Sequence, residues 1–522
     1  MEDDKVDDDN NDEEEKIEGT SRQDPGFGLL LKLKASYISP STLSLILCVR
    51  FISAIRCPFL QYGFPQQLAN AGIRKHMESL LSTWGFLLIF SNVSIVQFVL
   101  ASGGAITWPC QLSSFVDGYV DCSGDRNGTG PPFDVVNVDW HGAIGDGLTD
   151  DTQAFIDAWH EACTLDSAVL LIPFNKTYLV NHLEFKGPCG SGLVVELAGT
   201  LVAPADPSLW NKSHSNAWLH FSHLSGLSVE GGGTIDGQGQ QWWDQSCKRD
   251  KKNKCHDAPT ALRFSSVSNL KVRDLLSLNS PQIHIKFANC YGVDVVNLQV
   301  TAPEDSPNTD GIHISETQNV RIQDSSVGTG DDCVSIVRGS ADILVKNITC
   351  GPGHGISIGS LGKSGSDDFV SLVVVNGANL IGTTNGVRIK TWQGGSGAAI
   401  GILFENISMN NVSHPIIIDQ KYCDSSSSCS ANESSAVQVS QVYYKNIQGT
   451  SATKQAIKFE CSELAPCKGL LLENVNLVRE AGKGNSTTVC ENAQGFVIGR
   501  VFPTVDCLPP LLQADWLLHT SM

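Results

Sequence analysis

Four short polar segments between residues 306 and 395 carry side chains that could perform acid–base chemistry. They are SPNTDGIHI with Asn308 and Asp310, GTGDDCVSI with Asp331 and Asp332, CGPGHGISIGS with His354, and NGVRIKTWQGG with Arg388 and Lys390. Asp310 and Asp332 are 22 residues apart, and Asp332 and His354 are again 22 apart. In a repetitive fold this spacing is about one repeat, so these side chains would stack along one face.

Three carboxylates on adjoining repeats repel one another, which raises the pKa of at least one and keeps a protonated acid beside ionised bases. Inverting glycoside hydrolysis needs this division, because one carboxylic acid protonates the leaving oxygen while another, about 6.5 to 9.5 Å away, activates water. Arg388 and Lys390 share one face if they lie on a strand, and they could bind a uronate carboxylate. His354, between two glycines, could tune the acid or bind sugar.

Each motif alone has a simpler structural explanation. An Asp-Asp pair usually belongs to a turn, a Gly-His-Gly to a loop and an Arg-x-Lys to a surface strand, and only their recurrence at one-repeat spacing favours a site. We expect the remaining acidic residues of this region to be turn residues: Asp305, Asp324, Asp367 and Asp368. We expect His313, in an alternating strand, to have a packing or turn role instead of a catalytic one.

From about residue 220 onward, short alternating segments are separated by Gly, Asn, Asp and Ser, which is typical of β-strands and turns. Equivalent apolar positions recur at intervals of 23, 27 and 23 residues at Leu270, Val293, Val320 and Ile343. Periods of this length predict a solenoid. Because helices are lacking between the strands, we predict an all-β right-handed parallel β-helix with coils about 4.8 Å apart. A Greek-key sandwich is the competing β architecture.

One segment, FDVVNVDWHGAIGDGLTDDTQAFIDAWHEAC, predicts a strand, a Gly-Asp-Gly turn and then a helix. Asp150 or Asp151 could cap the helix, and its apolar residues recur at helical spacing: Ala154, Phe155, Ala158, Trp159 and Ala162. We expect this helix to cover the N-terminal end of the solenoid, where exposed strand edges would otherwise pair with other chains. Three asparagines are candidates for turn residues that stack between coils: Asn279, Asn289 and Asn347.

The formal net charge of −19 argues against a nucleic-acid partner, because phosphate neutralisation needs a basic face. A polyanionic substrate would be repelled at long range, so anion recognition needs a local cluster of basic residues. The 17 cysteines include the close pairs Cys423 with Cys429 and Cys461 with Cys467, but no CxxC doublets. This pattern indicates disulfides and an oxidising compartment, as do several N-x-S/T sequons.

The first hundred residues differ from the rest. Residues 1–16 form an acidic run typical of a disordered tail. An uncharged apolar stretch within residues 77–104, preceded by basic residues, resembles a signal peptide, or a membrane anchor if translation starts at Met1. We therefore divide the chain into a disordered segment or gene-model extension (1–76), a signal peptide or hydrophobic anchor (77–104), a linker (105–132), a catalytic domain (133–510) and a C-terminal tail (511–522).

At the four polar segments the sequence resembles the polygalacturonases, a glycoside hydrolase family with a right-handed parallel β-helix. The family's strings NTD, DD, GHG and RIK occur in order, and the resemblance extends over about residues 133–510 to GTIDGQGQQWW and to HPIIIDQKYCD with Tyr422. Plant members are most similar. The resemblance implies inverting hydrolysis of the α-1,4-galacturonosyl linkages of pectin without a metal or other cofactor.

The same resemblance implies a role for each residue. Asp331 would be the general acid, Asp310 and Asp332 would activate water, and His354 would affect the protonation of the acid. Substrate would be bound by Asn308, Arg388, Lys390 and Tyr422. The odd cysteine count after the predicted signal leaves one thiol unpaired, which we expect to be Cys290, while Cys333 and Cys350 are expected to form a disulfide. The protein would be a secreted monomer of the cell wall, without stable membrane association.

Three other functions stay open. A pectate lyase shares the solenoid but uses Ca²⁺ and a basic residue to abstract a proton. A rhamnogalacturonan hydrolase is a nearer alternative, although Arg388 and Lys390 favour a uronate at the cleavage site. A catalytically inactive polysaccharide-binding solenoid is disfavoured because the three aspartates Asp310, Asp331 and Asp332 are all present. Endo or exo action and tolerance of methyl esters are not decided by the sequence.

Overall fold

A computed structural model describes residues 134–210, 217–255, 258–423, 434–480 and 484–511, with a short hairpin of β1 (Phe115–Val116) and β2 (Tyr119–Val120). The chain divides into two units, Met1–Ala105 and Ile106–Met522, and all described residues belong to the second. The predictions for residues 1–76, 77–104, 512–522 and most of 105–132 therefore lie outside the described residues. No helix in the described ranges is long and apolar enough to cross a membrane.

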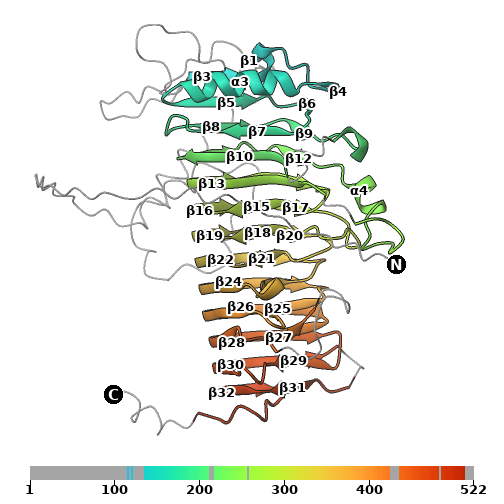
Figure 1. Ribbon diagram of the computed structural model, residues 1–522, viewed down its shortest axis with the longest axis vertical. Helices are drawn as coiled ribbons and strands as arrows, with labels where there is room; N and C mark the ends of the chain where they lie inside the picture. The colour runs from blue at the N-terminus through green and yellow to red at the C-terminus, as the bar shows by residue number, and fades with distance from the viewer. Residues whose placement is uncertain are drawn as a thin grey trace, which may run out of the picture. The chain divides into compact units, whose positions relative to one another are not determined.

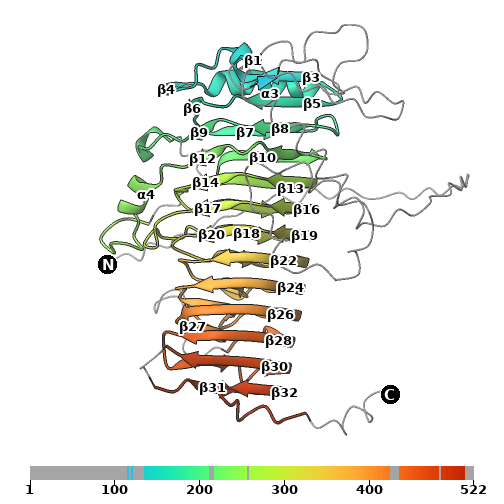
Figure 2. The same ribbon diagram turned by 180° about the vertical axis from the view of Figure 1, so that it is seen from behind.

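Parallel strands stack one above another into three ladders, which Figures 1 and 2 show from opposite sides. The first ladder, which carries the candidate site, contains β7 (Leu183–Lys186), β10 (Ala217–Ser225), β13 (Thr260–Arg273), β15 (Ile285–Ala288), β18 (Ile312–Ser315), β21 (Val334–Ile336), β23 (Ile356–Leu361), β25 (Asn385–Trp392), β27 (His414–Tyr422), β29 (Gln455–Glu460) and β31 (Thr487–Glu491).

The second ladder runs beside the first and shares the long strand β13 with it. It contains β3 (Asp134–Asn137), β5 (Ala168–Ile172), β8 (Val194–Leu197), β11 (Ser228–Glu230), β16 (Tyr291–Val296), β19 (Gln318–Gln323), β22 (Ser340–Cys350), β24 (Asp367–Ile381), β26 (Ser396–Val412), β28 (Gln438–Ser451), β30 (Cys467–Arg479) and β32 (Ala493–Phe502).

The third ladder joins the second at β22, because β20 and β19 both pair with that strand. It contains β4 (Asp146–Asp150), β6 (Thr177–Leu179), β9 (Thr200–Val202), β12 (Thr234–Asp236), β14 (Leu276–Leu278), β17 (Gln299–Thr301) and β20 (Ser326–Gly328). Together the ladders form the predicted right-handed parallel β-helix, the hand expected of parallel crossovers.

The repeat derived from the sequence is confirmed residue by residue. Leu270 pairs with Val293, Val293 with Val320, and Val320 with Ile343. All four side chains are buried. Because side chains alternate between the two faces of a strand, in-register pairing places apolar residues above one another inside the coil and polar residues above one another outside.

A column of phenylalanines shows this stacking most clearly. Phe185, Phe221, Phe264 and Phe287 occupy paired positions on β7, β10, β13 and β15. Successive ring centroids are 4.5, 5.3 and 5.5 Å apart, with interplanar angles of 20°, 19° and 16°. The rings lie in the hydrophobic core, where offset stacking adds to the stabilisation from burial.

The three predicted turn asparagines do stack between coils. Asn279, Asn289 and Asn347 have φ angles of 46°, 53° and 54°, a left-handed conformation that asparagine tolerates better than most residues. Their side-chain amides donate to residues of the preceding coil, namely Asp236, Ser266 and Asp324. The asparagines therefore satisfy polar groups at the corners while permitting the turn.

The predicted helix is present as α3 (Thr152–Thr164), and it buries the expected apolar residues. It contacts β3, β5 and β7 at the N-terminal end of the stack (Figure 1). Of the two candidate caps, Asp150 accepts a hydrogen bond from the backbone N–H of Thr152 at 3.0 Å. The carboxylate of Asp151 instead accepts from the N–H groups of Ile144 and Gly145. The other helical segments within the described ranges are η3 (Val138–His141), η4 (Pro207–Leu209), α4 (Gln240–Asp244) and η6 (Lys363–Gly365).

Disulfides join cysteines that are 6 to 26 residues apart in the sequence. The expected bond between Cys333 and Cys350 is present, and Cys290 is a free, buried thiol. The other described bonds are Cys163–Cys189, Cys247–Cys255, Cys461–Cys467 and Cys490–Cys507. Cys423 is also disulfide-bonded, but its predicted partner Cys429 lies outside the described residues.

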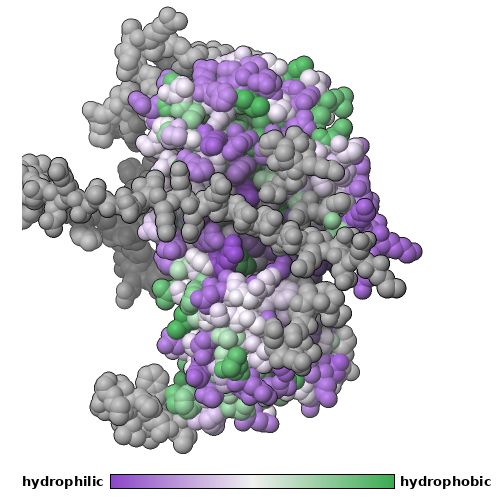
Figure 3. All heavy atoms as spheres, viewed as in Figure 1, coloured by the Kyte–Doolittle hydropathy of each residue, from purple (hydrophilic) through white to green (hydrophobic). Residues whose placement is uncertain are grey.

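On the face in Figure 3, hydrophilic residues cover most of the coloured surface and hydrophobic ones are scattered.

We predict that Phe264→Ala lowers the free energy of unfolding by about 3 to 5 kcal/mol, because it opens a cavity in the middle of the phenylalanine column. Phe264 is fully buried, whereas Phe174 is 63% exposed, so Phe174→Ala should change stability by less than about 0.5 kcal/mol. Denaturant-induced unfolding of both variants measures the difference. Equal effects would show that the column does not stabilise the solenoid.

Candidate active site

The predicted 22-residue spacing places the polar motifs on successive coils of the first ladder. Asp310, Asp332 and His354 each stand two residues before the paired residues Ile312, Val334 and Ile356, in the turns that lead into β18, β21 and β23. Arg388 on β25 pairs with Ser357 on β23. The fold therefore brings four sequence segments into contact on one face.

All eight predicted site residues line one groove with a volume of about 610 Å³. Its wall extends from Gln282 and Ile283, just before β15, to Tyr422 and Cys423 at the end of β27, and Lys248 from the loop after α4 (Gln240–Asp244) adds to it. Six strands of the first ladder, β15, β18, β21, β23, β25 and β27, or the turns before them contribute to it. The groove is therefore elongated along the stack, as a polymeric ligand would require.

Asp332 is a buried carboxylate held by two cations. Its Oδ1 accepts hydrogen bonds from Ser357 Oγ at 2.7 Å and Arg388 Nη2 at 2.8 Å, and its Oδ2 accepts from Lys390 Nζ at 3.1 Å. Burial alone would raise its pKa, but the charges of Arg388 and Lys390 outweigh burial and hold the pKa below the usual range. Asp332 is therefore ionised at neutral and mildly acidic pH.

Asp331, the adjacent residue, has the opposite electrostatic environment. Burial, followed by the negative charge of Asp310, raises the pKa of Asp331, while the hydrogen bond from His354 partly opposes the rise. His354 Nδ1 lies 3.0 Å from Asp331 Oδ1, and this bond raises the pKa of His354. A carboxyl with a raised pKa thus lies next to one with a lowered pKa, which is the combination that acid–base hydrolysis requires.

Asp310 is the third carboxylate of the acidic cluster, and it is held by a serine that the sequence did not identify. Ser335 Oγ donates to Asp310 Oδ2 at 2.6 Å, and Ser335 Oγ also lies 2.8 Å from His313 Nδ1. His313 was expected to have a packing role, but it lines the groove. Asp310, Asp332 and His354 are each followed, three residues later, by another polar residue: His313, Ser335 and Ser357. This recurrence was the signal in the sequence that could have identified these supporting residues.

Arg388 and Lys390 both face the groove, as predicted from their spacing. In the structure their charges are engaged by Asp332, and their side chains are only 12% and 11% exposed. Lys390 Nζ also lies 5.1 Å from the centre of the Tyr422 ring, within cation–π range. Trp392 contacts the same ring edge-on at 5.8 Å, so Tyr422 is held in place at the end of the groove.

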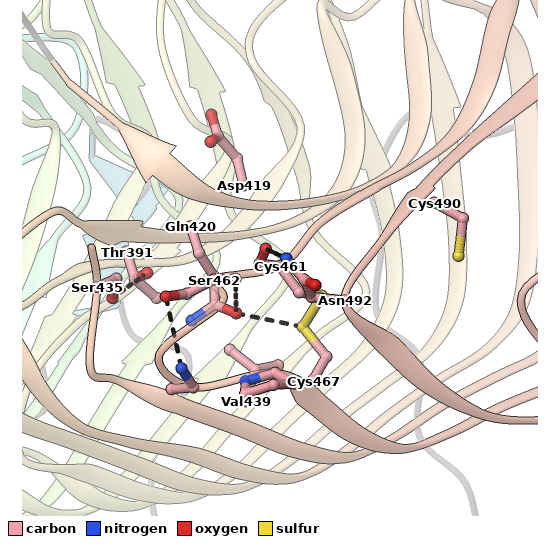
Figure 4. Close-up of a disulfide and its surroundings, with 12 residues drawn as sticks. Thr391, Asp419, Gln420, Ser435, Val439, Cys461, Ser462, Cys467, Cys490 and Asn492 are labelled. Carbon is pink, nitrogen blue, oxygen red and sulfur yellow. Dashed lines mark hydrogen bonds between the residues drawn. A yellow bond between two sulfur atoms is a disulfide. The ribbon is translucent and has the colours of Figure 1, made fainter. Parts of the chain in front are cut away.

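A buried hydrogen-bond network positions the strand that ends in Tyr422. Figure 4 shows Asp419 and Gln420 pointing to opposite sides of β27. The inward Gln420 donates from Nε2 to the Val437 carbonyl at 2.8 Å and accepts the N–H of Ser462 at 3.1 Å. The Sγ atom of Cys467, which forms the disulfide with Cys461, lies 3.3 Å from Gln420 Oε1 and packs against it. These contacts fix the strand two residues before Tyr422.

Asp331, Asp332 and His354 offer donor atoms within 4.8 Å of one another, the spacing of a possible metal site. Both oxygens of Asp332 already accept hydrogen bonds from cationic side chains, and the Nδ1 atom of His354 contacts Asp331. A metal cation placed among these groups would be repelled by Arg388 and Lys390. The donor set therefore fits a proton-transfer site better than a metal site.

Residues 163–501 match the family model described as glycosyl hydrolases family 28. The chain belongs to this family. Similar relatives include a polygalacturonase of Persea americana, 54% identical over 370 residues that cover 71% of this chain and 79% of the relative. Polygalacturonase-2 of Solanum lycopersicum is 52% identical over 369 residues, covering 70% and 79%.

Among solved structures, the endo-xylogalacturonan hydrolase of Aspergillus tubingensis is similar, with a TM-score of 0.60 and 26% identity over 70% of this chain and 99% of that one. Its fold and the family membership agree that this chain is a glycoside hydrolase with a parallel β-helix. The four polar segments and Tyr422 all lie within the matched residues.

The contrast between the two neighbouring aspartates predicts unequal effects of their substitution on the free energy of unfolding. Asp332→Asn should lower the free energy of unfolding at neutral pH by about 3 to 5 kcal/mol, because Arg388 and Lys390 lose their buried counter-ion. Asp331→Asn should change it by about 1 kcal/mol or less, because the variant loses one hydrogen bond but also the cost of a buried ionised carboxyl.

Chemical denaturation between neutral and acidic pH measures both effects. Because the pKa of Asp332 is lower in the folded than in the unfolded state, its carboxylate contributes stability above the unfolded-state pKa, and this contribution is lost as pH falls. The difference in the free energy of unfolding between wild type and Asp332→Asn should therefore become smaller on acidification. The interpretation would be wrong if Asp331→Asn were as destabilising as Asp332→Asn at neutral pH.

Proposed function

We propose that this chain is a polygalacturonase that hydrolyses α-1,4-galacturonosyl linkages of unesterified pectin with inversion. The observation that carries the proposal is the pair of neighbouring carboxyls with pKa values shifted in opposite directions in one elongated groove. The relatives named polygalacturonase support the choice of substrate. A secreted, cell-wall location accords with the disulfides.

In the proposed mechanism, the protonated Asp331 donates its proton to the glycosidic oxygen as the bond to the anomeric carbon breaks. A water molecule attacks that carbon from the opposite face and transfers a proton to the carboxylates of Asp310 and Asp332, so the charge of the three-aspartate group is conserved. Before the attack Asp332 is ionised because of Arg388 and Lys390, and the carboxylate of Asp310 accepts a hydrogen bond from the Ser335 hydroxyl.

Substrate binding falls to Asn308, Arg388, Lys390 and Tyr422. The contacts with Asp332 do not use all the N–H donors of Arg388 and Lys390. A guanidinium has five N–H donors and an ammonium three, whereas Arg388 uses Nε on Ser357 and one Nη2 contact on Asp332. The remaining donors can bind a uronate carboxylate. No metal or other cofactor takes part, and we expect the enzyme to act as a monomer.

Asp331→Asn should lower turnover on polygalacturonate by at least about 100-fold, because general acid catalysis contributes that much or more. The assay follows reducing ends and the absorbance of unsaturated products in the presence of a chelator. Saturated oligomers formed by the wild type without calcium would support hydrolysis, and unsaturated products that require calcium would favour a lyase. Near-normal turnover by Asp331→Asn would disprove the assigned role.

A second test follows from the raised pKa of Asp331. Because the protonated form is the proposed acid, activity should be present below this pKa and should decline as pH rises through it. His354 lowers the pKa of Asp331, so His354→Ala should move the alkaline decline of kcat to higher pH as well as reduce kcat. If the alkaline decline of kcat in His354→Ala stayed at the wild-type pH, a group other than Asp331 would control that decline.

A further inference from the structure

A loop closed by the disulfide between Cys247 and Cys255 carries most of the basic charge near the groove. Its seven internal residues, KRDKKNK, include five cations and one acid. It follows α4 and precedes β13, on the side of the groove that faces the N-terminal coils. In a chain with a formal net charge of −19, such a cluster is a local exception that could attract a polyanion.

The loop is fixed beside the groove by one of its own cations. Arg249 forms ion pairs with Asp244 at 3.1 Å and with Asp305 at 2.8 Å. Asp305 lies three residues before Asn308, and Lys248 of the loop lines the groove directly. Asn253 donates to the Asp244 carbonyl at 3.2 Å. The disulfide and these bonds hold the loop at the rim of the site.

The ammonium groups of the loop lysines are not used for the structure of the loop. Within the described part of the chain they form no ion pair and no hydrogen bond, at Lys248, Lys251, Lys252 and Lys254. The backbone N–H groups of Lys248 and Lys252 donate to side chains of the loop, and Arg249 pairs with Asp244 and Asp305. The last three of the four lysines are exposed. Four ammonium groups held close together repel one another, and an anionic ligand would relieve that repulsion.

The outer residues of the first ladder continue this positive charge. Paired positions on β10, β13, β15 and β18 are occupied by His220, Arg263, Lys286 and His313. Arg263 and Lys286 carry the positive charge, because burial, followed by the charge of Arg263, lowers the pKa of His220 to about 4. Lys286 is half-buried, and burial followed by the charge of Arg263 lowers its pKa. Two basic features on different elements, the loop and this column, thus lie on the same side of the catalytic aspartates.

On the opposite side of the aspartates the charge is reversed. The positions that pair successively with Lys390 on β27, β29 and β31 are Asp419, Glu460 and Glu491. Lys458 and Lys421 neutralise only part of this charge, through Glu460 and Glu491. An anionic polymer in the groove is therefore attracted toward the N-terminal coils and repelled beyond β25.

We propose that the loop between Cys247 and Cys255 is a binding arm for ionised carboxylates of the pectic chain, which extends from the catalytic aspartates toward the N-terminal coils. This inference rests on the proposed function and deepens it. Coil spacing of about 4.8 Å puts the column residues Lys286 and Arg263 roughly 10 and 14 Å from the coil of Asp331, so several consecutive sugars contact the arm and the column. Methyl esterification in this stretch removes the charge that both recognise.

The test uses the triple variant Lys251→Gln, Lys252→Gln, Lys254→Gln in the full chain. Its kcat/KM on polygalacturonate at low ionic strength should fall about 10-fold, through a higher KM, with a weaker dependence on salt. The loss should be much smaller on highly methyl-esterified pectin. The corresponding triple Lys→Arg variant should restore the wild-type values, because it retains the charge.

A matched control removes the same charge elsewhere, by Lys271→Gln, Lys346→Gln and Lys468→Gln, three exposed lysines on strands of the second ladder. Retention of Asp331→Asn protein on immobilised polygalacturonate, with and without the loop substitutions, gives a second readout that is independent of turnover. The inference is overturned if the loop and control triples behave alike in both assays. If the wild type neither binds nor cleaves polygalacturonate, the proposed function itself fails.

Discussion

In-register parallel pairing of successive coils is the constraint on which the rest of this structure depends. Each backbone pairs with the coils before and after it, so a residue's neighbours in space are set by the repeat length and not by proximity in sequence. Asp310, Asp332 and His354 meet because their spacing matches the length of their coils. The same constraint aligns the phenylalanines inside the coil and the asparagines at its corners.

Within this frame, one dipeptide provides both electrostatic requirements of the site. Asp331 and Asp332 are adjacent, yet their carboxyls lie in different surroundings, one near Asp310 and the other between Arg388 and Lys390. The two cations therefore act on the site even before any substrate arrives, because they fix the charge of Asp332. This arrangement also explains why a cluster with metal-like spacing is a poor place for a metal.

The sequence predicted the solenoid and its repeat, because hydrophobic period is a local property, and the eight proposed site residues all line one groove. It did not predict that Arg388 and Lys390 contact Asp332, since that contact depends on how deeply each side chain lies below the groove surface. His313 was assigned to packing because strand alternation alone does not reveal which outer face lines a groove. Asp151 is the N-cap residue of α3, but its carboxylate contacts the backbone of a separate turn, and the side chain of Asp150 accepts the Thr152 N–H instead, a division that the sequence could not show.

The separation of inward and outward positions on each strand has an evolutionary consequence. Inner residues such as Phe264 determine whether the coils stack, whereas outer residues such as Lys286 and Asp419 lie on the outer face, beside outer residues of the coils before and after. A substitution at an outer position can thus change the charge of one stretch of the groove while the core stays intact. Descendants of one stable solenoid can in this way diversify toward pectins with different patterns of esterification.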